Sequence, residues 1–210
     1  MGKFDLNKGD RFKLDKSSGL SKIQVELGWK GGVDLDASTF LLGEDGVILR
    51  DEDFVYFKSE NRSKPFDRNE YGNKKKWREE TRPMSFDGAV LGSIDETGDD
   101  ADESDASNET IDVDLDSVDG KITEIVFLVT IYNREEETGI TFKEVIDPYI
   151  KIIDADNGSD ILQYKLSENF ASETGVVVGK LNCNIDGEWE FEAIGKGYDG
   201  GLQTFVDMFT

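Results

Sequence analysis

The stretch KIQVELGWKGGVDLDASTFLL, residues 22–42, contains two apolar segments on either side of a pair of glycines. In the first segment every second residue is apolar: Ile23, Val25 and Leu27. That period of two is typical of a half-buried β-strand. In the second segment Asp34 and Asp36 alternate with apolar neighbours, so a strand would carry both carboxylates on one face. Either these carboxylates face solvent or they hold a cation, and the stretch alone leaves both possibilities open.

The rest of the chain repeats the strand pattern. Further short apolar segments are RFKLDK (11–16), DFVYFK (53–58), TIDVDLDSV (110–118), EIVFLVTIY (124–132), YIKIID (149–154), GVVVGKL (175–181) and EWEFEAIG (188–195). Turn residues separate them, and Asp186-Gly187 predicts a hairpin. Residues 141–148 predict one or two helical turns ended by Pro148, and residues 200–209 predict a C-terminal helix. We therefore expect an all-β-dominated fold, a β-sandwich of two sheets with short peripheral helices, in one domain spanning residues 1–210.

Charge and composition limit the possible functions. The chain has 46 acidic and 24 basic residues, a net charge of −22, no histidine and one cysteine, Cys183. The negative charge disfavours nucleic acid and anionic membranes as partners. The missing histidines exclude His-based triads and His-containing zinc sites. No apolar run is long enough for a transmembrane helix, so we expect a cytoplasmic protein without membrane insertion.

Charge is also distributed unevenly along the chain. Residues 58–82 contain nine Lys and Arg against five Asp and Glu, and residues 83–120 contain no Lys or Arg. We predict that residues 58–85 form an inserted, mobile loop. The acidic run at about 95–110 has carboxylates one to three residues apart with small residues between them, as a calcium-binding loop requires. A disordered acidic linker is the alternative. The three aspartates of TIDVDLDSV are better explained as a solvated outer strand face.

The order of the motifs carries a family resemblance. The segments VDLDASTFLL, DEDFVYF, NETIDVDL, KITEIVFLVTIYN, FKEVIDPYIKIID, SETGVVVGKL and GEWEFEAIGKGYDGGL together resemble the TerD family of bacterial tellurium-resistance and stress-response proteins. The resemblance covers residues 14–209 apart from the basic segment, and DLDAS and IGKGYDGGL are its sharpest motifs. It implies a cytoplasmic β-sandwich that binds calcium and has no known catalytic activity.

The resemblance also implies a set of calcium ligands. It associates calcium with the DLDAS aspartates and with the acidic loop. The implied ligands are Asp34, Asp36, Asp99, Asp100, Asp102, Asp105 and Glu109. The loop lacks the internal glycines of the family pattern, so Asp95 or Asn108 are alternative ligands.

Three functions are compatible with these observations. The first is a calcium-binding stress-response protein that acts by Ca²⁺-dependent ordering and by binding partners, among them other stress or tellurium-resistance proteins. The second is a hydrolase or phosphoryl-handling enzyme with carboxylate-bound Mg²⁺ or Mn²⁺, although no catalytic constellation is visible. The third is an adaptor in which residues 74–78 (KKKWR) dock an anionic partner; alternatively, these cations fold back over the acidic loop of the same chain.

Overall fold

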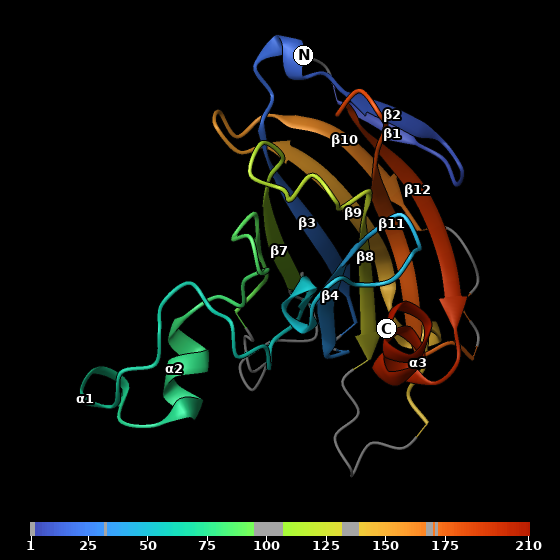
Figure 1. Ribbon diagram of the computed structural model, residues 1–210. Helices are drawn as coiled ribbons and strands as arrows, with labels where there is room; N and C mark the ends of the chain where they lie inside the picture. The colour runs from blue at the N-terminus through green and yellow to red at the C-terminus, as the bar shows by residue number, and fades with distance from the viewer. Residues whose placement is uncertain (1–2, 32, 95–106, 132–138, 167–169, 171) are drawn as a thin grey trace.

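Two six-stranded sheets dominate the computed structural model, which describes residues 3–31, 33–94, 107–131, 139–166, 170 and 172–210. The first sheet has the order β1-β10-β9-β3-β7-β6, with β1 Phe4–Leu6, β10 Asp160–Lys165, β9 Ile146–Asp154, β3 Lys22–Lys30, β7 Ser107–Asp114 and β6 Val90–Leu91. The second has the order β2-β12-β11-β8-β4-β5, with β2 Arg11–Leu14, β12 Trp189–Tyr198, β11 Gly175–Cys183, β8 Glu124–Ile131, β4 Leu35–Leu42 and β5 Phe54–Val55. Every pairing is antiparallel except β1 with β10. The expected β-sandwich is confirmed (Figure 1).

The core lies between the sheets, as the strand alternation predicts. The apolar residues Ile23, Val25 and Leu27 of β3 are buried in it. Strand β4 is buried on both faces. Leu35 and Leu41 belong to the main core, whereas Phe40 belongs to a second cluster that includes Phe205 of the C-terminal helix α3, Gly201–Phe209. The expected C-terminal helix is therefore present, and it covers the outer face of the second sheet (Figure 1).

The structure confirms the predicted hairpin and corrects the predicted helical segment before Pro148. The hairpin at Asp186-Gly187 joins β11 to β12, with Gly187 at φ +77°. Residues 141–148, predicted as one or two helical turns, contain only the 3-10 helix η3, Phe142–Glu144. Pro148 lies inside β9 and does not end a helix. The strand tolerates this proline because the register of β9 against β3 shifts at that point, where a backbone N–H is dispensable.

Residues 58–85, predicted as an inserted, mobile loop, contain regular structure. They contain two short helices, α1 Arg68–Tyr71 and α2 Lys74–Glu80. Asp67 and Asn73 cap their N-termini by accepting hydrogen bonds from backbone amides, which is why the chain turns helical at these points. The DFVYFK segment is also shorter than predicted, because only β5 pairs and a 3-10 helix, η2 Asp51–Asp53, precedes it. A further 3-10 helix, η1 Lys16–Ser18, follows β2.

In the part of the chain that the structure describes, no helix is long and apolar enough to cross a membrane.

Candidate functional site

The DLDAS motif forms the beginning of β4. Asp36 is 7% exposed, and Asp34, just before the strand, is partly buried. Of the two possibilities that the sequence leaves open, a pair that simply faces solvent does not describe Asp36. Its neighbours Leu35 and Ala37 face the core between the sheets. A carboxylate at such a depth is stable only where hydrogen bonds or opposite charge compensate its lost hydration.

Glu109 joins the two sheets next to Asp36. One of its carboxylate oxygens accepts a hydrogen bond from the backbone amide of Ala37 at 2.7 Å. This amide needs an outside acceptor because β5 pairs only with Thr39 and Phe40, which leaves the first half of β4 at an open edge. Glu109 belongs to β7 of the opposite sheet. The structure thus brings a carboxylate from each sheet to one seam, which we call the DLDAS seam (Asp34, Asp36, Ala37 and Glu109).

The other predicted ligands lie outside the described residues: Asp99, Asp100, Asp102 and Asp105, together with the alternative Asp95. Asn108 is described and lies exposed in β7. Among the residues that the structure describes, no group of three or more acidic or cysteine side chains lies close enough to hold a metal ion. The carboxylates of the DLDAS seam are the hard oxygen donors that calcium prefers, but they are fewer than its six to eight ligands. The seam therefore fits calcium as one part of a larger site.

The three aspartates of TIDVDLDSV are part of a paired outer surface. The alternating residues Ile111, Val113 and Leu115 are buried, as predicted. Each aspartate contacts a cation: Asp112 pairs with Arg82, Asp114 with Lys22 at 3.8 Å and Asp116 with Lys16 at 2.9 Å. Because each aspartate has its own cation, we interpret the three as an outer strand face of ion pairs and not as ligands of one metal ion.

A second acidic group, which the sequence analysis missed, lies at the other end of β4. Asp53 is 1% exposed, and neither of its carboxylate oxygens has a hydrogen-bond partner. Its nearest cation is Arg50, at 3.6 Å. That guanidinium also donates to Asp119 at 2.7 Å and lies over the ring of Phe86. The only sequence signal is the acidic run Asp51-Glu52-Asp53, which looks like a solvated turn.

Burial dominates the electrostatics of Asp53. It raises the pKa of this carboxyl from its ordinary value of 3.8 to about 6, although Arg50 lowers it. The negative charges of Asp87 and Asp119 raise it further. The same arginine has the opposite effect on Asp119, where its hydrogen bond lowers the pKa. Because Arg50 shares its charge between two carboxylates, it compensates the buried Asp53 only in part.

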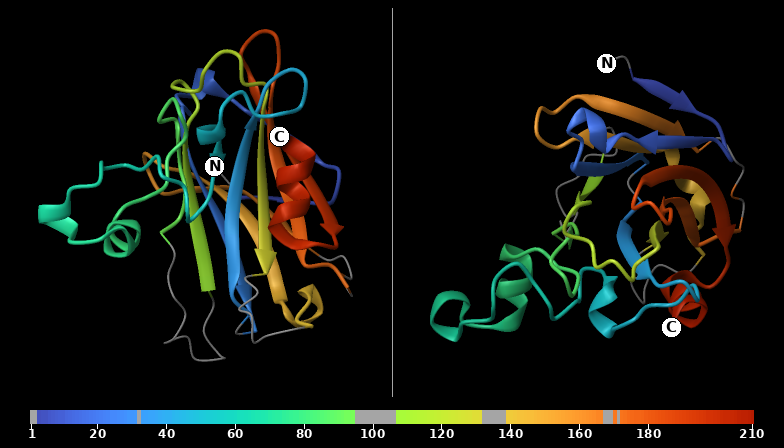
Figure 2. Two further views of the ribbon diagram at one scale, coloured as in Figure 1. Left: turned by 60° about the horizontal axis from the view of Figure 1, so that its bottom comes forward. Right: turned by 45° about the horizontal axis from the view of Figure 1, so that its top comes forward.

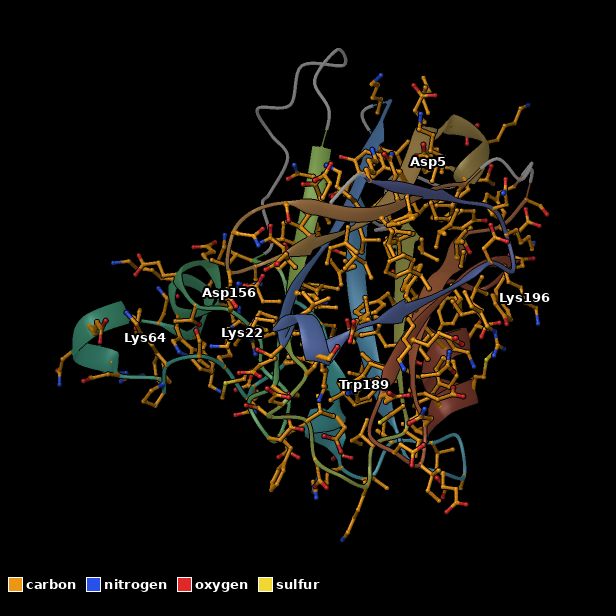
Figure 3. The ribbon with its side chains drawn as sticks, turned by 90° about the horizontal axis from the view of Figure 1, so that it is seen from above. Asp5, Lys22, Lys64, Asp156, Trp189 and Lys196 are labelled. Carbon is orange, nitrogen blue, oxygen red and sulfur yellow. The ribbon has the colours of Figure 1, made fainter. Side chains whose placement is uncertain are left out.

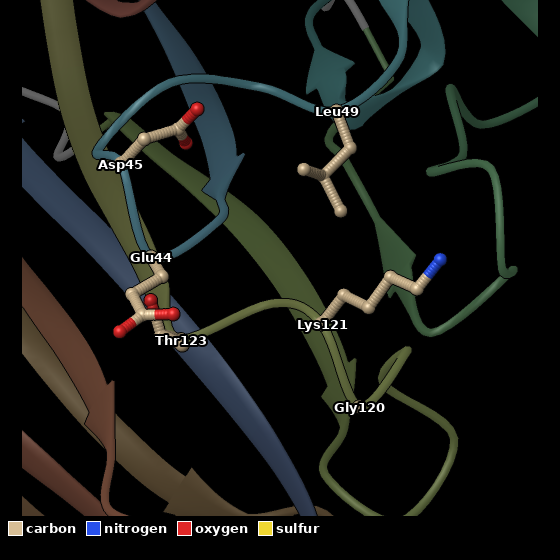
Figure 4. A pocket seen from close by; sticks show the side chains of 6 residues that line it. All are labelled: Glu44, Asp45, Leu49, Gly120, Lys121 and Thr123. Atoms are coloured by element: carbon tan, nitrogen blue, oxygen red, sulfur yellow. The ribbon is translucent and has the colours of Figure 1, made fainter.

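An open pocket of about 680 Å³ lies near this end of the sandwich and is lined by Glu44, Asp45, Leu49, Gly120, Lys121 and Thr123 (Figure 4). The ammonium group of Lys121 points away from the Glu44 carboxylate. The lining offers no convergent set of polar groups for a ligand, so we assign no function to it.

Comparison with known proteins fixes the family. The TerD domain model matches residues 2–79 and 83–209. The chain belongs to the TerD family. The match includes most of the basic segment, which the sequence resemblance had left out. The expectation drawn from the DLDAS and IGKGYDGGL motifs is thereby confirmed.

Relatives in the TerD family are bacterial resistance and stress proteins. The chain is 30% identical to the tellurium resistance protein TerD of Serratia marcescens, over 97% of this chain and 95% of that protein. It is 34% identical to general stress protein 16U of Bacillus subtilis, over 94% and 92%. The crystal structure of a homologue of telluride resistance protein from Streptomyces coelicolor has the same fold, with a TM-score of 0.61, 18% identity, and coverage of 90% and 96%.

Proposed function

We propose that this TerD family member is a calcium-binding stress-response protein of the tellurium-resistance type. In this proposal it acts in the cytoplasm by binding partners, among them other stress or tellurium-resistance proteins, and not by catalytic turnover. The hydrogen bond from Ala37 to Glu109 carries the proposal, because it ties a carboxylate-bearing residue of one sheet to the residue that follows the buried Asp36 in the other. A buried carboxylate is stabilised in its charged form by a nearby positive charge, which a bound cation would supply. The names of the relatives support the stress role.

The residues of the chain have distinct parts in this proposal. Asp34, Asp36 and Glu109 form the part of the site built on strands, and Asp99, Asp100, Asp102 and Asp105 complete it from the acidic segment. Calcium supplies two positive charges and a coordination shell of six to eight oxygens. Glu109 fixes β7 against β4, so a change in the acidic segment that precedes β7 reaches both sheets. We infer that the ordered segment then forms the surface that a partner recognises.

Thermal unfolding with Ca²⁺, with Mg²⁺ and with a chelator tests this proposal. Calcium bound only by the folded chain should stabilise it by about 2.7 kcal/mol at a hundredfold excess over Kd. The Asp34→Asn, Asp36→Asn double variant should lose most of this calcium-dependent rise in Tm. The matched control is Asp5→Asn, Asp186→Asn, which removes the same charge from two exposed positions and should keep the rise. An unchanged wild-type Tm at millimolar calcium would refute the proposal.

A further inference from the structure

Residues 58–82, which we call the basic appendage, differ in charge from the rest of the molecule. They carry a net charge of +4, whereas the remaining residues carry −26. Helices α1 and α2 project from the side of the sandwich, away from both sheets (Figures 1 and 2). Surface charges farther apart than about 8 Å are screened from one another at physiological salt. The projecting end of the appendage therefore presents its own charge to solvent, and the negative body does not cancel it.

A buried arginine organises the basic appendage from within. Arg62 donates hydrogen bonds to the carbonyl oxygens of Phe57, Ser59, Arg78 and Thr81, and to the hydroxyl of Thr81. Five donors in a fixed planar geometry can hold several chain segments at once. The appendage thus has a hydrogen-bonded centre of its own.

Aromatic side chains also pack inside the basic appendage. Trp77 and Tyr71 are buried but belong to neither hydrophobic cluster of the sandwich. The indole N–H of Trp77 donates to the Lys64 carbonyl at 2.8 Å, and the ring of Phe66 packs edge-on against the indole. These contacts hold the Lys64–Phe66 stretch in place although it contributes nothing to the sandwich core.

Arg82 attaches the appendage to the first sheet. Its guanidinium pairs with Asp112 of β7 and donates to the carbonyl oxygens of Leu91, Gly92 and Thr110. Such a multidentate contact fixes direction as well as position. The appendage is therefore held firmly at its base and exposed at its far end.

The cations of the appendage are not equivalent. Lys74 and Arg78 pair with Glu60, Lys75 pairs with Glu79, and Lys76 pairs with Glu80, all within the appendage. These four cations share three glutamates, so most of the charge of the cluster that the sequence offers as a docking site is compensated within the appendage.

Lys64 and Arg68 differ from these cations. Across the described residues, neither side chain forms an ion pair. They lie on either side of Phe66 in the sequence, and the Phe66 side chain is 36% exposed. Figure 3 shows Lys64 on the appendage, away from the sandwich. We call Lys64, Phe66 and Arg68 the appendage tip.

We propose that the appendage tip is a docking surface for a short acidic segment of another protein that carries an apolar residue. The two cations without an ion pair attract the carboxylates, and the exposed part of Phe66 receives the apolar side chain. Nucleic acid fits less well, because a long polyanion extends past the tip and meets a body of charge −26. The surface adds a specific contact to the proposed partner binding, and it is formed by residues outside the DLDAS seam.

The test is fluorescence anisotropy with a labelled short peptide rich in Asp and Glu around a central Leu. The wild-type chain should bind it, and added salt should weaken the binding. The Lys64→Glu, Arg68→Glu variant should bind about tenfold or more weakly. Phe66→Ala should also weaken it, and a peptide with Asn and Gln in place of Asp and Glu should not bind.

The matched control is Lys143→Glu, Lys165→Glu, which changes net charge equally at two exposed positions off the appendage. It should retain binding; an equal loss in both variants would show a net-charge effect and overturn the proposal. Tighter binding of a single-stranded DNA oligonucleotide than of the peptide, or no peptide binding by the wild type, would also overturn it. The Tm rise with calcium in the tip variant reports the proposed function separately, because the tip variant keeps the DLDAS seam.

Discussion

Asp53→Asn is the substitution for which the structure gives the most quantitative expectation. The folded chain holds this carboxyl at a pKa of about 6, compared with 3.8 ordinarily, chiefly through burial. A difference of about 2 pKa units corresponds to about 3 kcal/mol. Above pH 6 the folded state keeps an ionised carboxylate that makes no hydrogen bond, and its free energy of unfolding is lower by about this amount. Asparagine has nearly the same shape without the charge, so the variant should be about 2–3 kcal/mol more stable at pH 7.

The pH dependence has a definite sign. Between about pH 4 and pH 6 the folded chain binds more protons at Asp53 than the unfolded chain does. The contribution of this group to stability therefore increases as the pH falls through 6, and it is complete below about 4. Other carboxylates titrate in the same range, so the useful quantity is the difference between wild type and variant. Urea unfolding at a series of pH values from 4 to 8 should show this difference shrinking toward acid pH.

The neighbouring Arg50 opposes this gain in stability. Removing one partner of a buried ion pair is usually costly, because the other charge is left uncompensated. Here Arg50 keeps Asp119 and the face of Phe86. Asp51→Asn is the matched control, since it removes one charge from an exposed position of the same 3-10 helix. If Asp53→Asn were less stable than wild type at pH 7, or if the difference did not change with pH, burial would not be the dominant effect at this site.

Two further predictions concern the sheets. Glu109→Ala, measured by urea unfolding in the presence of a chelator, should lower the free energy of unfolding by about 1.5–3 kcal/mol, because the Ala37 amide loses its charged acceptor. Glu109→Gln should lower it less. Equal urea midpoints for the wild type and both variants would contradict this. Gly28→Ala should cost about 1–3 kcal/mol because its Cβ would overlap the ring of Tyr149. In a Tyr149→Ala background the same change should be nearly neutral, and a double-mutant cycle by urea unfolding measures the difference.

Local sequence patterns predict most of the strands, because apolar alternation and turn residues depend only on neighbouring residues in the sequence. Alternation of apolar residues placed β3 and β7, and Asp186-Gly187 placed the hairpin between β11 and β12. The errors occurred where long-range pairing or capping overrode composition. The pattern predicts a helix end at Pro148, but the pairing of Ile146 and Tyr149 with β3 places this proline inside β9. The composition of residues 58–85 predicts an inserted, mobile loop, whereas Arg62 and Trp77 give this segment a folded centre.

The candidate site was predictable only in part. The family motif pointed to Asp34, Asp36 and Glu109, but not to the hydrogen bond through which Glu109 meets β4. That bond spans 72 residues of sequence and exists because β5 is too short to cover the edge of β4. Likewise, the composition of the KKKWR cluster suggests a docking site, whereas the structure pairs its cations with nearby glutamates and leaves Lys64 and Arg68 of the appendage without an ion pair among the described residues.

The sequence by itself determined the strand alternation, the amphipathic last helix, the strong negative charge and the oxygen-rich residue types of a calcium site. Each of these depends on the identity and spacing of neighbouring residues. Only the tertiary structure decided which carboxylates are buried, which cations remain unpaired and which strand edges meet. These properties depend on segments far apart in the chain. Asp53 is an example: its neighbours in sequence suggest an exposed acidic turn, but burial in the folded chain raises its pKa to about 6.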